Sequence, residues 1–204
     1  MKKKVNLYEG HIEASLIESL RTLNNLIKQK QEISEIAKVL VEAYKRGNKL
    51  VLFGNGGSAA DAQHIATELI GGFKDHERKS LPALALTTDT SALTAIGNDY
   101  GFEKVFSRQV EGLVNKGDVI IALSTSGNSR NVLDGAYAAK RKDAVVIGFT
   151  GKDGGFLKQY CDICLCIPSN TTAKIQEAHM TVGHILCGII EESLTSAQPT
   201  ITIN

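Results

Sequence analysis

Apolar side chains recur at helical spacing through the first 47 residues. The positions are Ile12, Leu16, Leu20, Leu23, Ile27, Ile33, Ile36, Leu40 and Tyr44. A repeat of three or four residues predicts amphipathic helices, and Gly47 suits the left-handed position that ends the second of them. These helices precede every strand-like segment. They can pack on the body of the protein or on other subunits, and we expect a mixture of both.

From Lys49 onward the pattern changes to short apolar runs separated by helical stretches. The runs are "KLVLF", "PALAL", "DVIIAL", "AVVIGF" and "DICLCI", and the helical stretches are 58–71, 90–96, 102–114, 129–141, a short one near Phe156, and 172–194. Nearly continuous apolar runs are typical of strands buried on both faces, and alternating strands and helices indicate a parallel sheet. We therefore predict one α/β domain over residues 1–204. It has a five-stranded parallel sheet with helices on both faces, a helical extension at 1–47 and a tail at 196–204.

Composition and charge exclude several classes of function. The formal net charge is +1, and the only basic cluster, Lys2 to Lys4, is best explained as a solvated N-terminus. A nucleic-acid surface would show a basic excess, and a membrane span would need roughly 20 apolar residues in a row. No apolar segment that would mark a secretory signal follows the N-terminal charges. We expect a cytoplasmic protein that binds neither nucleic acid nor membrane.

Three of the four cysteines occur in "YCDICLCIP", and the fourth is Cys187. Cys161 and Cys164 have the spacing of a redox or zinc pair. If this segment is a strand throughout, residues three apart point to opposite faces of the sheet, and no second pair is present. We therefore expect buried, reduced thiols.

Two strand-to-helix junctions carry unusual loops. The first is "GNGGS" after the first strand, and the second is "STSGNS", which holds Ser124, Thr125, Ser126 and Ser129. Hydroxyl groups together with the free N–H groups at a helix N-terminus suit a phosphate. A helix cap alone would need only one such residue, so the second loop predicts a phosphate site.

The glycine loop also matches the relaxed dinucleotide fingerprint G-x-G-x-x-A, with Asp75 about 20 residues further on. That fingerprint needs its acid at the end of a second strand, whereas Asp75 lies in the polar stretch "KDHERKS". The hydroxyl-rich loop favours the monophosphate of a small molecule instead.

Two helices carry paired polar residues at helical spacing. His64 and Glu68 are four apart and share a face, and Gln176 and His184 are eight apart on the last helix. Two histidines and a carboxylate could bind Zn²⁺. For each residue, a surface pair or a buried histidine without a catalytic role is the simpler alternative.

At these residues the chain resembles a known family. The segments "FGNGGSAADAQHIATEL", "LTTDTSALTAIGNDYGFEKVFSRQVEGL", "KGDVIIALSTSGNSRNVL" and "KIQEAHMTVGHIL" resemble the phosphoheptose isomerases of the sugar isomerase (SIS) domain family, whose fold is flavodoxin-like. The resemblance covers nearly the whole chain. It implies conversion of D-sedoheptulose 7-phosphate to D-glycero-D-manno-heptose 7-phosphate for lipopolysaccharide, capsule or glycoprotein synthesis. It also implies a homotetramer with active sites between subunits.

The resemblance assigns roles by position. Glu68 and His184 are the implied catalytic acid–base pair, and one Zn²⁺ per subunit is implied at His64, Glu68, Gln176 and His184. Substrate contacts are implied for Asn55, Gly56, Gly57, Ser58, Glu68, Asn98, Asp99, Ser124, Thr125, Ser126, Ser129 and Gln176.

Two other functions remain as alternatives. A non-enzymatic branch of the same family binds the replication initiator, but that branch lacks the residues matching Glu68 and His184, and both are present here. A sugar-phosphate sensor usually carries a DNA-binding module, and residues 1–47 show no helix-turn-helix pattern. The sequence therefore favours the isomerase.

Overall fold

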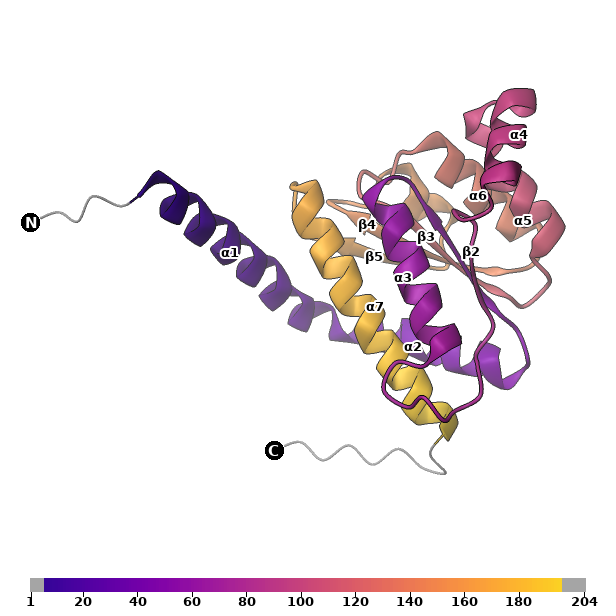
Figure 1. Ribbon diagram of the computed structural model, residues 1–204, viewed down its shortest axis with the longest axis horizontal. Coiled ribbons are helices and arrows are strands. Elements are labelled where there is room, and N and C mark those ends of the chain that lie inside the picture. Colours follow the sequence, from indigo (N-terminus) through magenta and orange to yellow (C-terminus); the bar gives the residue numbers. More distant parts are fainter. Residues whose placement is uncertain (1–5, 196–204) are drawn as a thin grey trace, which may run out of the picture.

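A computed structural model describes residues 6–195, so the Lys2–Lys4 cluster and the tail at 196–204 lie outside the described residues. The core is a five-stranded sheet in the order β2-β1-β3-β4-β5, with every pair parallel (Figure 1). The strands are β1 (Leu50–Gly54), β2 (Ala83–Ala85), β3 (Val119–Ser124), β4 (Val145–Gly151) and β5 (Ile163–Ile167). This is the flavodoxin-like strand order, and the predicted α/β class is confirmed.

Helices cover both faces of the sheet. They are α1 (Leu7–Leu26), η1 (Ile27–Gln29), α2 (Lys30–Lys45), α3 (Gly57–Gly71), α4 (Thr90–Tyr100), η2 (Phe102–Lys104), α5 (Ser107–Leu113), α6 (Arg130–Arg141), η3 (Gly155–Tyr160) and α7 (Thr172–Thr195). Alternate residues of β1 serve the two sides: Leu52 packs in the core with α2, α3 and α7, and Phe53 packs in the core with α5 and α6. Both sides of β1 and β3 are fully buried, which explains their continuous apolar runs. None of the helices between residues 6 and 195 is long and apolar enough to span a membrane.

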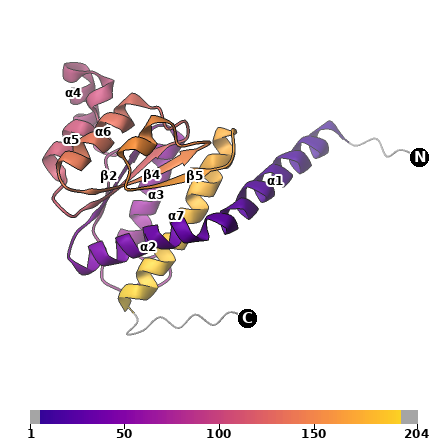
Figure 2. The same ribbon diagram turned by 180° about the vertical axis from the view of Figure 1, so that it is seen from behind.

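The N-terminal extension divides into two parts with different roles. Helix α2 is part of the core, because no more than 1% of the surface of Ile36 or Leu40 is exposed. Gly47 follows it with φ +80°, as the sequence predicted. Helix α1 instead projects from the body (Figure 2) and leaves Ile12, Leu16 and Leu20 at least 59% exposed. Of the two N-terminal helices, α2 thus packs on the body of the protein, whereas α1 keeps an uncovered apolar stripe.

Three details differ from the sequence prediction. The helix predicted at 102–114 is divided into η2 and α5, and α4 runs on to Tyr100 rather than ending near Ile96. The strand predicted at "DICLCI" is confirmed as β5, but the extension of that strand to Cys161 was wrong, because β5 begins only at Ile163. Cys161 precedes it, so the sulfur atoms of Cys161 and Cys164 both lie beside Gly148 rather than on opposite faces. All four cysteines are free; Cys187 is buried and the other three are half-buried.

Candidate active site

The two unusual loops lie side by side at the carboxyl edge of the sheet. Gly54 at the end of β1 is in register with Leu123 near the end of β3. The side-chain amides of Asn55 and Asn131 exchange two hydrogen bonds of 2.8 Å, which tie the glycine loop to the first turn of α6. The amide of Asn55, expected to contact the sugar, is thus already bonded to Asn131, a residue the sequence analysis missed.

The hydroxyl group at the N-cap position of α6 does not cap the helix, although Asn131 Oδ1 accepts the N–H of Val132 in the first turn at 3.0 Å. Ser129 occupies the N-cap position of α6 but its hydroxyl makes no capping bond; it accepts a hydrogen bond from the Ser124 hydroxyl at 3.2 Å. Ser126 is exposed, and its hydroxyl accepts the N–H of Asn128 at 3.1 Å. Helix capping therefore does not explain Ser129. The loop combines hydroxyl groups with the positive end of a helix dipole, and both features suit a phosphate.

The same loop is braced from behind by the segment that contains η3. Gly127 has φ +67°, and a side chain there would collide with the carbonyl oxygen of Gly154. The N–H of Leu157 donates to the Gly127 carbonyl at 2.9 Å, and the N–H of Phe156 donates to Asn128 Oδ1 at 3.0 Å. The loop is therefore fixed by tertiary contacts and not only by its own turn.

The glycine loop serves two purposes. Gly56 (φ +56°) has open space where a side chain would be, so a ligand can approach its backbone. Gly57 begins α3, and a Cβ there would lie 2.5 Å from Nε2 of Gln176 on α7. Gly57 thus makes room for Gln176, which brings this predicted site residue to the start of α3. Ser58 is buried, at 3% exposure, against Gly54.

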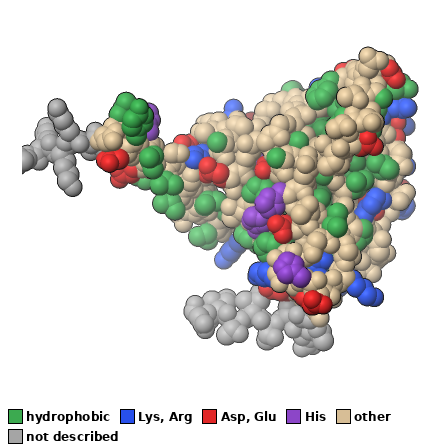
Figure 3. All heavy atoms as spheres, viewed as in Figure 1, with side chains coloured by type: hydrophobic (Ala, Val, Ile, Leu, Met, Phe, Trp, Pro, Cys, Tyr) green, Lys and Arg blue, Asp and Glu red, His purple; other side chains and the backbone are tan. Residues whose placement is uncertain are grey.

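The predicted histidine and carboxylate groups converge between α3 and α7. Nε2 of His64 lies 3.0 Å from Glu68 Oε1 and 3.1 Å from Nε2 of His184, and one atom of each residue lies within 4.8 Å of the others. Figure 3 shows histidine side chains grouped on the face that carries α3 and α7, with an acidic side chain beside them. Nε2 of His64 has one lone pair or one N–H, which lies in the ring plane, so it cannot hydrogen-bond well to both Glu68 and His184. The two close distances instead indicate that the three groups are arranged around one point in space.

The donor set fits a zinc ion. Zinc bound tetrahedrally at about 2.0–2.1 Å places neighbouring ligand atoms roughly 3.3 Å apart, close to the separations of 3.0 and 3.1 Å at His64. His64, Glu68 and His184 would hold the ion. Gln176 lies eight residues before His184, about 12 Å along the helix axis, and its side chain extends beside Gly57.

One carboxylate near this cluster was missed in the sequence. Asp61 lies one turn before His64 on the same face of α3. Its Oδ2 is buried with no hydrogen-bond partner among residues 6–195. Burial raises the pKa of Asp61 to about 6, although the nearby His64 lowers it. The spacing Asp61, His64, Glu68 was the signal that could have revealed it.

Other predicted residues lie elsewhere. Asn98 and Asp99 are on the exposed part of α4, and Nδ2 of Asn98 donates a hydrogen bond to Oδ1 of Asp99 at 2.8 Å. His179 is fully buried, with Nε2 3.1 Å from the Thr150 carbonyl oxygen, and burial lowers its pKa to about 4. His179 therefore faces the sheet.

Comparisons with known proteins identify the family. The model of the SIS domain matches residues 16–151. The chain is 55% identical over 184 residues to the phosphoheptose isomerase of a Nitratiruptor species, covering 90% of this chain and 98% of that protein. The solved structure of the phosphoheptose isomerase of Neisseria gonorrhoeae is 42% identical, with a TM-score of 0.85 over 90% of this chain and 98% of that one. That of Francisella tularensis is 38% identical, with a TM-score of 0.82 over 90% and 95%. The chain belongs to the SIS domain family and, within it, to the phosphoheptose isomerases.

Proposed function

We propose that this enzyme converts D-sedoheptulose 7-phosphate to D-glycero-D-manno-heptose 7-phosphate, the first step of bacterial heptose precursor synthesis. The observation that carries the proposal is the convergence of Glu68 and His184 between α3 and α7, which start at the same sheet edge as a hydroxyl-rich loop. The named relatives support the choice of a heptose phosphate.

Aldose–ketose isomerisation moves a proton between C1 and C2 through an enediol. It needs a base for the carbon-bound proton and an acid for the carbonyl oxygen, each typically worth about 10²- to 10⁴-fold in rate. In our proposal the Glu68 carboxylate carries the carbon-bound proton and the His184 imidazole acts at the oxygen. Ser124, Thr125, Ser126 and Ser129 hold the phosphate.

A zinc ion at this site would polarise the substrate carbonyl. We propose His64, Glu68, Gln176 and His184 as its ligands, one ion per subunit. A Glu68 that is fully engaged with a metal is a weaker base, so either the ligands exchange during turnover or the metal-bound form is not the catalytic one. Metal analysis paired with activity before and after chelation distinguishes these two cases.

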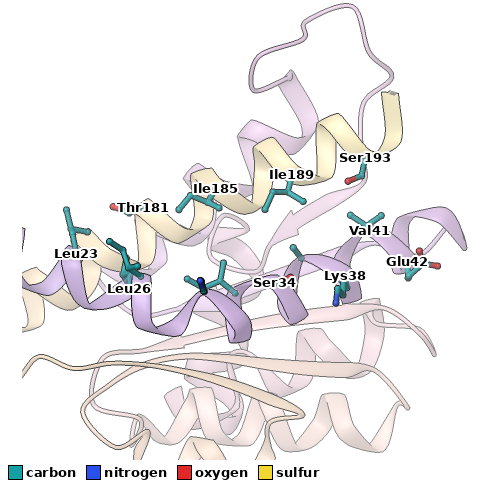
Figure 4. A pocket seen from close by; sticks show the side chains of 14 residues that line it. Leu23, Leu26, Ser34, Lys38, Val41, Glu42, Thr181, Ile185, Ile189 and Ser193 are labelled. Carbon is teal, nitrogen blue, oxygen red and sulfur yellow. The ribbon is translucent and has the colours of Figure 1, made fainter. Parts of the chain in front are cut away.

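The assembly that we propose is a cytoplasmic homotetramer with active sites near subunit contacts. An apolar groove of about 850 Å³ runs between α2 and α7, lined by Leu26, Ile33, Val41, Ile185 and Ile189 among others (Figure 4). The uncovered apolar stripe of α1 is a matching surface for the groove of a second copy. Ile185 follows His184 directly, so such a contact would lie one residue from the proposed acid–base pair.

The direct test is an aldose-forming assay on sedoheptulose 7-phosphate with purified protein. Turnover that is lost in Glu68→Gln supports the proposal. A folded wild-type chain that binds the sugar phosphate without turning it over would favour a sensor, and one that neither binds nor converts it would favour the initiator-binding branch.

A further inference from the structure

The segment that follows α3 returns to the active-site helix α7. Helix α3 ends at Gly71 and is followed by Gly72, whose φ is +105°, and residues 73–80 form no regular element. The first of them, Phe73, stacks on the imidazole ring of His184 with ring centroids 5.6 Å apart and an interplanar angle of 18°. One face of the proposed acid–base histidine is therefore covered by a side chain from an irregular segment.

A buried carboxylate on α7 holds this segment in place. Glu191 is 3% exposed and accepts the backbone N–H groups of Phe73, Lys74 and Asp75 at 3.0, 2.8 and 2.9 Å. It also accepts Nε of Arg78 at 2.7 Å. Glu191 follows His184 by seven residues, about two helical turns, so both project from the same side of α7.

Arg78 connects the same network to the other helix of the site. Its side chain is only 3% exposed, and it donates to the backbone carbonyl of Glu68 at 2.9 Å. Burial alone would raise the pKa of Glu191, but the hydrogen bonds from Arg78 and the three amides hold it at about 2. The network is thus a buried ion pair at neutral pH that touches the backbone of Glu68 and, through Phe73, the ring of His184.

We infer that Phe73 is a positioning residue for His184, and that Glu191 and Arg78 act through it. The inference rests on the proposed function of His184. The torsion that turns an imidazole ring has a broad minimum, so a ring with one free face can rotate. Stacking against Phe73 restricts this rotation and keeps Nε2 directed at His64 and Glu68.

The first test replaces the ring itself. Phe73→Leu retains an apolar side chain but removes the planar stack, and we expect kcat to fall about 10-fold or more because small misplacements of reacting groups are costly. KM should change less than about 2-fold, because the phosphate loop is untouched. Phe73→Tyr keeps the ring and should retain wild-type kcat. Equal kcat in the leucine variant and the wild type would overturn the inference.

The second test addresses the buried pair. Glu191→Gln should lower kcat as Phe73→Leu does, although it alters neither stacked ring. If this variant does not fold, Arg78→Lys serves instead, because a lysine ammonium cannot reproduce the contacts of the guanidinium group with Glu191 and with the Glu68 carbonyl together. Glu192→Gln is the matched control: it breaks the exposed Lys74–Glu192 pair between the same segment and the same helix and should leave kcat unchanged.

Loss of stability by itself must not be mistaken for loss of positioning. Asp118→Asn disrupts another buried carboxylate, bonded to Lys49 and Asn115 at the opposite edge of the sheet, and should lower the melting temperature without lowering kcat. If Asp118→Asn lowers kcat as much as Glu191→Gln, the inference is wrong.

A second measurement does not depend on turnover. The chain has five histidines, so the ring signals of ¹³C-histidine-labelled protein can be assigned with His184→Gln. Phe73→Leu and Glu191→Gln should both shift or broaden the His184 signal, and Glu192→Gln should not. An inactive wild type would refute the proposed function alone. An unmoved His184 signal in Glu191→Gln would refute the role assigned to the buried pair.

Discussion

At the scale of single residues, the proposed chemistry depends on Glu68. Glu68→Gln preserves shape but removes the base, so we expect kcat to fall by at least about 100-fold while substrate still binds at the phosphate loop. His184→Gln should behave similarly and should also reduce any zinc content. Steady-state kinetics and substrate titration measure both effects.

His179→Gln is the control for that experiment. His179 is buried against β4, where its Nε2 lies 3.1 Å from the Thr150 carbonyl oxygen, so its replacement should change turnover much less. If His179→Gln abolishes turnover while Glu68→Gln stays near wild type, the assignment of the acid–base pair is wrong.

The burial of His179 leads to a prediction for the pH dependence of stability. Its pKa falls from 6.5 to about 4 on folding. Between these values the unfolded chain binds a proton that the native chain does not, so the free energy of unfolding decreases as pH falls, by at most about 1.4 kcal/mol per pH unit. Asp61, with its pKa raised to about 6, contributes with the opposite sign.

The measurement that isolates His179 is urea unfolding at pH 7 and pH 5 for the wild type and His179→Gln. The loss of stability on acidification should be smaller in the variant, because Asp61 and the other carboxylates are common to both. An identical pH dependence in the two proteins would show that His179 does not titrate differently on folding.

At the scale of elements, the strand–loop–helix unit from β3 to α6 is the proposed phosphate site. Ser126 is its exposed hydroxyl, so Ser126→Ala should raise KM much more than it lowers kcat if the lost interaction is the same in ground and transition states. Ser193→Ala, near the far end of α7, is the control and should change neither constant. An unchanged KM in Ser126→Ala would show that this hydroxyl does not bind the phosphate.

At the scale of the whole molecule, the two N-terminal helices should respond differently to deletion. Removing residues 1–26 takes away the exposed stripe of α1, a helix about 30 Å long, and leaves α2 in the core. We expect a folded protein of lower oligomeric state, measured by size-exclusion chromatography with light scattering, and reduced activity if subunit contacts complete the site.

Removing residues 1–47 should be more damaging, because it exposes the core positions that Ile36 and Leu40 cover. We expect an aggregating or dissociated, inactive protein. A soluble, active monomer made of residues 48–204 would contradict both the packing role of α2 and the proposed assembly.

The sequence by itself determined the features whose signals are local. The periodicity of apolar residues predicted the five strands and the covering helices, because the burial of a strand or of a helix face requires apolar residues at a regular spacing within that segment. His64 and Glu68 could be paired because four residues make one helical turn. The hydroxyl-rich loop was recognisable from composition alone.

Only the tertiary structure decided the contacts between segments that have no periodicity. Phe73 lies in an irregular stretch, and nothing near it in the chain indicates that it meets His184, more than 100 residues away. The same holds for the Asn55–Asn131 pair and for Gly57, whose missing side chain is required by Gln176 on α7. Cys161 was misplaced because the start of an edge strand depends on its neighbour β4 and not on its own sequence. Such contacts follow from the packing of elements against one another, which a local pattern does not encode.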